Sequence, residues 1–478
     1  MPRKLTAIVI AALLLLSAFA YPAYRGSTAS FLLFDLSFVA MLSLALPRPR
    51  SHVYIFFAVM LFLGFWLKLI LHMITGANLL EPVGFFSDNS EAWDRTLEVA
   101  SVAAIGVAAA RLLHLACGAR AGAWETVSPD PVPSWYSGWR VMIWGASTLA
   151  LLTLSLLNFQ VAFFQAGVNP RLILPYHINV LAGWMINIGF ALWFAVLIHW
   201  EFQNSARDLA RMLVFPIIEG LVSSASALSR SLFFLHTIPY LFTVASDWTK
   251  KRGMLSRRAL IGLALSWTVC FAISLTLVSW FRINIFQLAY QPALVAVPGQ
   301  TEIATKPIAG ATMSNQIKPA LIQVSRLFVD RWIGLEGVMA VSSYPDLGFG
   351  LLADALGSPK RDNASLYQTI AKSGYESSER FTFATLPGIA GVLFYSGSLA
   401  AVGLGTLLVT LLMIGTELAA LRFTGNPFFT SLAALGMANV ACQMTFPYLS
   451  MIFLLQLWVA VVFVCALQRW RLHPVLAR

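Results

Sequence analysis

Long apolar segments, separated by short clusters of charge and proline, run through almost the whole chain. Most come close to the roughly 20 residues that a helix needs to cross a bilayer. Twelve segments are found, at about residues 5–21, 29–46, 53–72, 97–115, 140–158, 180–199, 209–227, 231–247, 259–281, 386–414, 427–445 and 449–468. The pattern predicts an all-α polytopic membrane protein with about 12 transmembrane helices.

The composition excludes several other classes of protein. Hydrophobic residues make up 58% of the 478 residues and charged residues 11%, whereas about a quarter of the residues in a soluble domain are charged. A soluble enzyme, a secreted disulfide scaffold, a coiled coil and a disordered protein are therefore excluded. The four cysteines form neither a CxxC pair nor a framework for external disulfides.

The distribution of Lys and Arg predicts the orientation in the membrane. With the N-terminus inside, the inside segments carry about 18 of these residues, as the preference of positive charge for cytoplasmic loops requires. The short outside loops carry only Arg25, Arg95, Arg171 and Arg230. We expect both termini in the cytoplasm, and the net charge of +11 then needs no nucleic-acid partner.

One outside loop is far longer than the others and divides the chain into three parts. Residues 1–281 hold the first nine predicted transmembrane helices, residues 282–385 form the large extracytoplasmic loop, and residues 386–478 hold the last three. The first segment has a basic start and ends on Ala18-Phe19-Ala20, a pattern that also fits signal-peptidase cleavage. Whether residues 1–20 are retained stays open.

The motifs of nucleotide and metal chemistry are not found. The chain has no GxxxxGK[ST] sequence, and its longest inside loop, at about 116–139, is too short for a nucleotide-binding domain. The seven histidines show neither HxxxH nor HExxH spacing. We expect no cofactor and no metal site, and substrates that reach the outer side already activated.

The large loop contains a stretch with helical periodicity. Apolar residues recur at the spacing of one helix face, at Leu321, Val324, Phe328, Trp332, Leu335 and Met339. Arg326 and Asp330 lie four residues apart on another face, and Arg331 and Glu336 add charge beside the apolar stripe. The pattern predicts an amphipathic helix, either a solvated interfacial helix or one whose arginines bind an anion such as phosphate.

Two arginines of this loop share a spacing to glycine. Ten residues separate Arg326 from Gly337, and ten separate Arg380 from Gly391. After Arg380, Pro387-Gly388 interrupts the start of the tenth apolar segment, which is rich in small residues. Such residues favour close helix packing, or a backbone opening where a lipid-linked substrate lies.

Ionisable residues also fall within or beside the predicted spans. Glu219, Arg230 and His236 belong to a serine-rich pair of segments, and an ionisable group in a membrane is a candidate functional residue. Internal pairing of Glu219 and hydrogen bonding of a packed His236 are the structural alternatives. Lys68 and Asp35 are expected to snorkel or to pair. In another outer loop, Arg171 and His177 could line the same external chamber.

The architecture and three stretches resemble the bacterial oligosaccharide repeat-unit polymerases of the Wzy type, or O-antigen polymerases. The stretches are RLFVDRWIGLEGVMAVSSYP, RFTFATLPGIAGVLFYSGS and IEGLVSSASALSRS, at residues 326–345, 380–398 and 218–231. The resemblance implies a glycosyltransferase of the inner membrane that joins undecaprenyl-diphosphate-linked oligosaccharides on the periplasmic face, without nucleotide or metal. Flippase and chain-length regulator proteins are the partners it implies, besides membrane lipid.

The resemblance also assigns roles to individual residues. Arginines in Arg-x10-Gly patterns hold the anionic lipid carrier in that family, which implies this role for Arg326 and Arg380. In some members the two patterns lie in separate loops, whereas here both lie in one. Arg331, Arg230 and Arg171 are further candidates for binding the diphosphate, and Glu336 or His177 for the base near the acceptor hydroxyl.

Three other functions remain open from the sequence. A ligase of the same architecture would differ only in its acceptor. A flippase or other transporter needs charge lining a path through many spans, whereas here the ionisable residues gather towards the outer side. A polyprenyl-monophosphate-sugar transferase resembles its relatives in acidic residues of the first outer loop, but residues 22–27 read PAYRGS.

Overall fold

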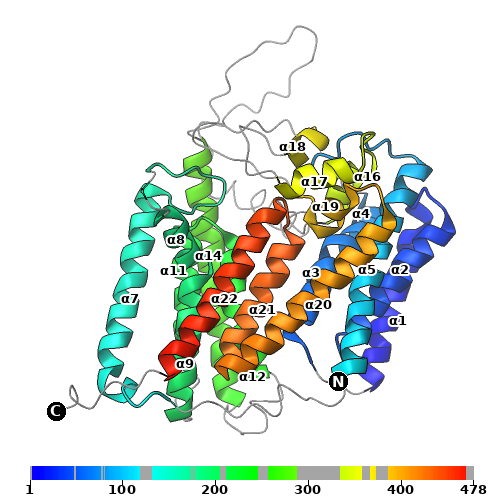
Figure 1. Ribbon diagram of the computed structural model, residues 1–478. Coiled ribbons are helices and arrows are strands. Elements are labelled where there is room, and N and C mark those ends of the chain that lie inside the picture. The colour runs from blue at the N-terminus through cyan, green and yellow to red at the C-terminus, as the bar shows by residue number, and fades with distance from the viewer. Residues whose placement is uncertain are drawn as a thin grey trace, which may run out of the picture.

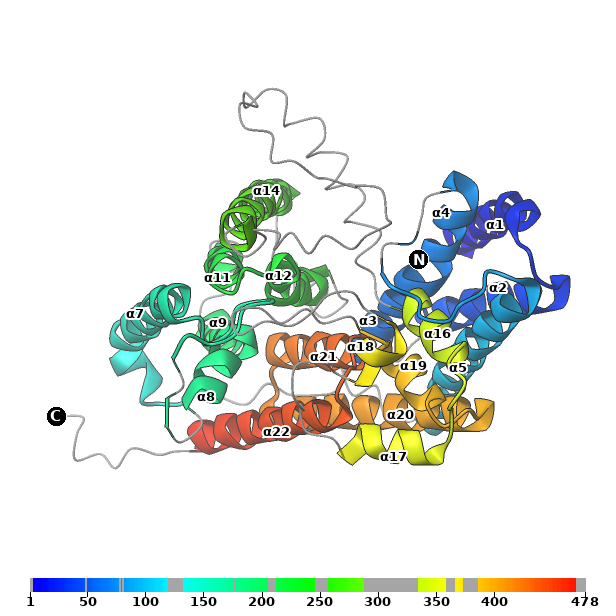
Figure 2. The same cartoon turned by 90° about the horizontal axis from the view of Figure 1, so that it is seen from above.

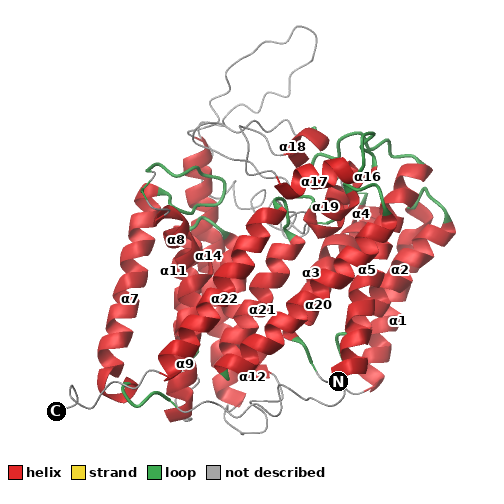
Figure 3. Ribbon diagram, in the orientation of Figure 1, coloured by secondary structure: helices red, strands yellow, loops and turns green. Residues whose placement is uncertain are grey.

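A computed structural model describes residues 3–47, 50–76, 79, 81–118, 132–172, 174–175, 178–204, 212–245, 257–287, 334–357, 366–372 and 386–469. Throughout these ranges the regular structure is helical, without β-strands (Figure 3). Among the described residues, seven helices are long and apolar enough to cross a membrane, namely His52–Thr75, Ser90–Cys117, Tyr136–Val161, Ile178–Gln203, Arg258–Arg282, Leu399–Thr424 and Pro447–Arg469. The prediction of a helical membrane protein is therefore confirmed at this level.

The first group of helices comprises α1 (Arg3–Ala20), α2 (Thr28–Ser43), α3 (His52–Leu61), α4 (Lys68–Thr75) and α5 (Ser90–Gly118). A π-helical stretch, η2 (Phe62–Leu67), joins α3 to α4 in one continuous span. Such π-bulges are rare inside helices and are frequent at functional sites.

The second group comprises α7 (Tyr136–Val161), α8 (Ile178–Trp184), α9 (Phe190–Asn204), α11 (Val214–Ser226), α12 (Arg230–Ala245) and α14 (Arg257–Gln287). Here too a π-helical stretch, η3 (Met185–Gly189), joins α8 to α9. Figures 1 and 2 show the two groups on opposite sides of α21 (Pro427–Cys442).

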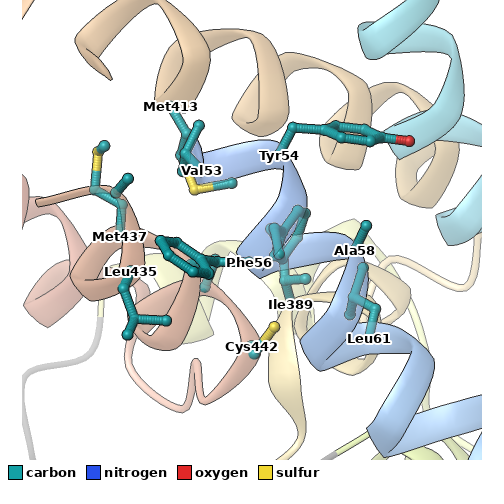
Figure 4. Close-up of a cluster of buried hydrophobic side chains, with 14 of the residues drawn as sticks. Val53, Tyr54, Phe56, Ala58, Leu61, Ile389, Met413, Leu435, Met437 and Cys442 are labelled. Atoms are coloured by element: carbon teal, nitrogen blue, oxygen red, sulfur yellow. The ribbon is translucent and has the colours of Figure 1, made fainter. Parts of the chain in front are cut away.

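Helix α21 forms the centre of the molecule. It packs against α3 from the first group and against α9 and α12 from the second, and most of its residues are buried. Figure 4 shows apolar side chains of α3, α19 (Gly388–Phe394), α20 (Leu399–Thr424) and α21 meeting there, among them Val53, Phe56, Leu61, Ile389, Met413, Leu435 and Met437. Small residues such as Ala433, Ala434 and Ala438 let the neighbouring helices approach closely.

Four short helices form a layer at one end of the bundle, opposite the start of α1 (Figure 1). They are α16 (Leu335–Ser342), α17 (Phe349–Gly357), α18 (Leu366–Ile370) and α19 (Gly388–Phe394). We call this set the α16–α19 layer. The last long helix, α22 (Pro447–Arg469), begins close to it.

Two helix predictions are wrong in this layer. The amphipathic helix predicted from Leu321 through Met339 is not continuous, because Gly334 has a φ of 154° and α16 begins after it, at Leu335. Residues 321–333 of the prediction lie outside the described residues. Every residue of α16 is buried, so this part is not an interfacial helix. The segment predicted at 386–414 is likewise two helices, because Gly397 has a positive φ and Ser398 caps a new helix at Leu399.

Candidate functional site

Helices α16 and α19 contact each other through the glycines of the two Arg-x10-Gly patterns. A Cβ atom on Gly337 would lie 2.5 Å from the carbonyl oxygen of Pro387, and one on Gly391 would lie 3.5 Å from the carbonyl oxygen of Gly337. The backbones approach so closely that only glycine fits at position 337 without movement. The structure thus brings the ends of the two patterns together. Arg326, Arg331 and Arg380 themselves lie outside the described residues.

Glu336, a predicted candidate base, forms an ion pair with Lys68 of α4. The Lys68 Nζ to Glu336 Oε1 distance is 2.5 Å, and the two side chains are only 2% and 3% exposed. Burial raises the pKa of the Glu336 carboxyl, and the Lys68 ammonium opposes that shift. Lys68 therefore pairs rather than snorkels, and Glu336 links the layer to a membrane span.

A second contact holds α16 from the neighbouring span. The hydroxyl groups of Ser342 in α16 and Thr96 in α5 lie 3.1 Å apart in a buried hydrogen bond. Two residues before Lys68, the indole Nε1 of Trp66 in η2 donates to Asp35 of α2 at 2.6 Å. Asp35 therefore also has an internal partner, and this hydrogen bond ties the π-helical stretch to α2.

Two buried tyrosines belong to the same region. Tyr367 of α18 interacts electrostatically with Tyr395 and with Glu336, and burial raises the pKa of its phenol. Tyr395 follows α19, and burial raises the pKa of its phenol as well. Both tyrosines are therefore neutral O–H groups at physiological pH. The Tyr395 hydroxyl has no hydrogen-bond partner among the described residues.

A second cluster of ionisable residues lies on the other side of α21. His236 Nδ1 of α12 is 2.9 and 3.1 Å from the two carboxyl oxygens of Glu219 in α11. Its Nε2 lies 2.8 Å from the carbonyl oxygen of Asn187 in η3. The Ser223 hydroxyl donates to Glu219 at 2.7 Å. Glu219 is therefore paired internally, and His236 is packed and hydrogen-bonded, which are the two structural alternatives given by the sequence.

The hydrogen-bond partners of His236 and Glu219 indicate which of their atoms carry protons. A carbonyl oxygen can only accept, so Nε2 of His236 carries a proton. One further proton is shared between Nδ1 and the Glu219 carboxyl, and in either location the pair is neutral overall. A neutral pair is tolerated in a buried site, whereas a net charge there would be costly. The arrangement therefore fixes α11, α12 and η3 relative to one another.

The remaining candidates lie away from the α16–α19 layer. Arg171 is exposed and donates from Nη1 to the carbonyl oxygen of Gln160 at 3.1 Å. Arg230 begins α12 and is partly buried. His177 lies outside the described residues, directly before α8. Arg171 is thus held at the end of α7, and Figures 1 and 2 place α7 and the layer on opposite sides of α21, so Arg171 does not lie beside Glu336.

Sequence reasoning missed one arginine beside the layer. The guanidinium carbon of Arg95 in α5 lies 5.6 Å from the ring centroid of Phe394 in α19, within the range of a cation–π contact. Arg95 is exposed, so its guanidinium is accessible at the edge of the layer. The position of Arg95 in the first turns of a predicted span could have marked it as a candidate, but no neighbouring sequence pattern indicated its contact with α19.

A buried carboxylate on the opposite end of the bundle was also missed. Glu417 of α20 accepts from the Ser51 hydroxyl at 2.5 Å and from the His52 amide at 2.6 Å, at the start of α3. Its charge therefore stabilises the N-terminus of that helix. The signal was a single acidic residue near the end of an apolar helix.

Within the described ranges, no group of three His, Cys, Asp or Glu side chains could hold a metal ion. The class of protein that these observations define is a helical membrane protein with buried ion pairs. The chain matches no protein-family model, no curated protein and no solved structure.

Proposed function

We propose that this protein polymerises lipid-linked oligosaccharide repeat units at the periplasmic face of a bacterial inner membrane. The observation that carries the proposal is the contact between Gly337 and Gly391. It brings the ends of the two Arg-x10-Gly patterns side by side. In the proposal Arg326 and Arg380, which precede these glycines and lie outside the described residues, act on one diphosphate.

The chemistry needs few groups beyond those present. A sugar diphospholipid carries its own leaving group, so no nucleotide has to supply energy. The protein must stabilise the departing diphosphate, and guanidinium groups do so with two parallel hydrogen bonds. Arg326, Arg331 and Arg380 take this role in the proposal, and Arg95 adds a further guanidinium at the edge of the layer.

Two residues are candidates for the base near the acceptor hydroxyl. The buried pairing with Lys68 supports a positioning role for Glu336. His177 is the other candidate, and Glu336→Gln and His177→Asn test the two separately. Substitution of the base should lower the activity of the protein and leave its stability unchanged, whereas substitution of a positioning residue should lower both.

We also propose about twelve membrane crossings, with the termini and the α16–α19 layer on opposite sides of the membrane. The seven long helices, together with shorter apolar helices such as α2, α11 and α21, support about twelve crossings. Both termini are then cytoplasmic and the α16–α19 layer is periplasmic.

The deciding experiment is the glycan made by a strain that lacks this protein. We expect single repeat units on their lipid carrier or at the cell surface, and restoration of long chains by the wild-type gene. Long polymer that remains on its carrier would indicate a ligase instead, and precursor that accumulates facing the cytosol would indicate a flippase.

A flippase is the second candidate, because buried charged pairs do occur among the helices of the bundle. Lys68–Glu336 and Glu219–His236 are the two clearest. Each pair is neutral and held by other protein groups, which favours a structural role over a path for a charged substrate.

The arginine variants provide the residue-level test. Arg331→Lys and Arg380→Lys should lose much of the polymerising activity, because lysine cannot offer the bidentate fork. Alanine at either position should cost about 2–4 kcal/mol of transition-state stabilisation, roughly 30- to 1000-fold in rate. The assay measures chain formation from purified lipid-linked repeat units, normalised to protein abundance. Normal rates in all variants would exclude these arginines from the site.

A further inference from the structure

Helix α17 has three distinct faces. Ala355 is buried, and Leu351 and Leu352 are partly buried against the protein. Phe349 is 67% exposed and Leu356 is 52% exposed, although both are large apolar residues. Asp354 is exposed and lies about 140° around the helix from Phe349, at 100° per residue. One face therefore meets protein, one is apolar and uncovered, and one is polar.

The apolar face continues an outward surface of the bundle. Helix α17 contacts α22, near its beginning, and lies at the outer edge of the molecule (Figure 2). Helix α22 is long and apolar enough to span the membrane, and its outward side chains include the exposed Met451 and Leu455. Tyr448, 51% exposed, lies one turn before Met451, and tyrosine is enriched where hydrocarbon meets headgroups.

From this arrangement we infer that α17 is an interfacial helix, with Phe349 and Leu356 among the acyl chains of the bilayer. A large apolar side chain gains about 1.5–3 kcal/mol when it leaves water. The polar face, with Asp354, then meets headgroups and water, which is the arrangement of a helix that lies in the plane of a membrane. The occupant of the uncovered face is therefore lipid.

The position of α17 brings one edge of the α16–α19 layer to the bilayer. Helix α17 contacts α19 as well as α22. A layer that is otherwise held by buried contacts thus has one edge on the bilayer, and a molecule with long acyl or prenyl chains can reach that edge without leaving the membrane. The placement of α17 does not depend on the proposed polymerase activity.

Nitroxide labelling tests the placement. Single cysteines at Phe349, Leu356 and Asp354 are introduced into a variant without the four native cysteines and labelled in vesicles of phosphatidylethanolamine and phosphatidylglycerol. Oxygen concentrates in the hydrocarbon and a nickel chelate stays in water. We expect a severalfold higher ratio of oxygen to nickel accessibility at positions 349 and 356 than at 354. Met451→Cys, on the outward face of α22, is the positive control.

Two results would overturn the inference. Nickel accessibility at positions 349 and 356 equal to that at 354 would show that the face meets water. Protection of both labels from both reagents would show that protein covers it, either a second copy or another chain.

A crosslinking experiment removes the dependence on a cysteine-free variant. Benzoylphenylalanine in place of Phe349, with the native cysteines retained, should form adducts with phospholipid on illumination, detected as a mass increase. The same residue in place of Asp354 should form far fewer. Covalent dimers at position 349, or adducts at neither position, would contradict the assignment.

Discussion

Lys68 and Glu336 show how a charge can be accommodated inside this bundle. An isolated ammonium or carboxylate would be very costly at 2–3% exposure. Paired at 2.5 Å, the two charges neutralise each other and join a membrane span to the α16–α19 layer. Such pairs contribute little net stability compared with apolar residues, but removal of one partner leaves the other charge buried.

Single and double variants should reveal this coupling. Lys68→Met and Glu336→Gln should each lower the free energy of unfolding by about 3–5 kcal/mol, because the remaining buried charge loses its ion-pair partner. The double variant Lys68→Met/Glu336→Gln should cost much less than the sum of the two. The measurement is thermal unfolding of purified protein in detergent.

The exposed ion pair between Arg25 and Asp88 is the matched control. It has the same 2.5 Å separation, but its side chains are 65% and 55% exposed, and such pairs contribute about 0–1 kcal/mol. Arg25→Met should therefore change the stability little. Additive effects of the Lys68 and Glu336 substitutions would show that the pair is not energetically coupled.

Among the elements, α16 and α19 depend most on backbone proximity. Their contact leaves no room at Gly337, where the obstacle is the backbone of Pro387, and little at Gly391, where it is the Pro387 ring. A Cβ atom at position 337 would lie 2.5 Å from the Pro387 carbonyl oxygen, whereas one at position 391 would lie 3.0 Å from the Pro387 Cβ, so the second clash is the smaller. Overpacking of a buried contact typically costs about 1–3 kcal/mol.

A graded series of glycine substitutions follows from this geometry. Gly337→Ala should lower the unfolding temperature most and Gly391→Ala less. Gly350→Ala is the control in the same layer, because a Cβ there meets nothing within 4 Å. It should be neutral or stabilise the protein by about 0.5–1 kcal/mol, as alanine does in a helix. Equal effects at all three positions would mean that the α16–α19 contact is not tight.

Across the whole molecule, α21 joins two groups of helices. The first group is joined to the α16–α19 layer by the buried Lys68–Glu336 pair, and the second group contains the buried Glu219–His236 pair. Each pair also lies beside a π-helical stretch, η2 or η3. In the second group that stretch presents the Asn187 carbonyl oxygen to His236. In the first group Lys68 directly follows η2, and Trp66 within η2 donates to Asp35.

The orientation of the whole chain has its own test. Alkaline phosphatase fused near Asn315 should be active, because the Lys and Arg distribution predicts that this loop is outside. A fusion near Lys251, between two predicted spans on the inside, should be inactive. The reverse pattern of activity would place the α16–α19 layer in the cytosol, and the proposed use of lipid-linked periplasmic substrates would then be wrong.

The alternation of apolar segments with charged loops was sufficient to predict a helical membrane protein and the approximate position of most helices. This works because a chain inside hydrocarbon must satisfy its backbone hydrogen bonds within each helix, so local hydropathy decides where helices form. Local hydropathy predicted one span at residues 386–414. This was wrong because α19 is as apolar as a span but is a short buried helix of the layer. Burial in protein and burial in lipid select the same residues.

The partners of the ionisable residues came from the fold alone. Lys68 and Glu336 belong to distant parts of the chain, and no local pattern links them. Glu219 and His236 were recognisable as unusual, but the Asn187 carbonyl that completes their arrangement comes from a π-helical stretch on another helix. Likewise Gly337 and Gly391 share a spacing in the sequence, yet their contact depends on how two short helices pack. Local pattern governs helix formation, whereas long-range packing governs which side chains meet.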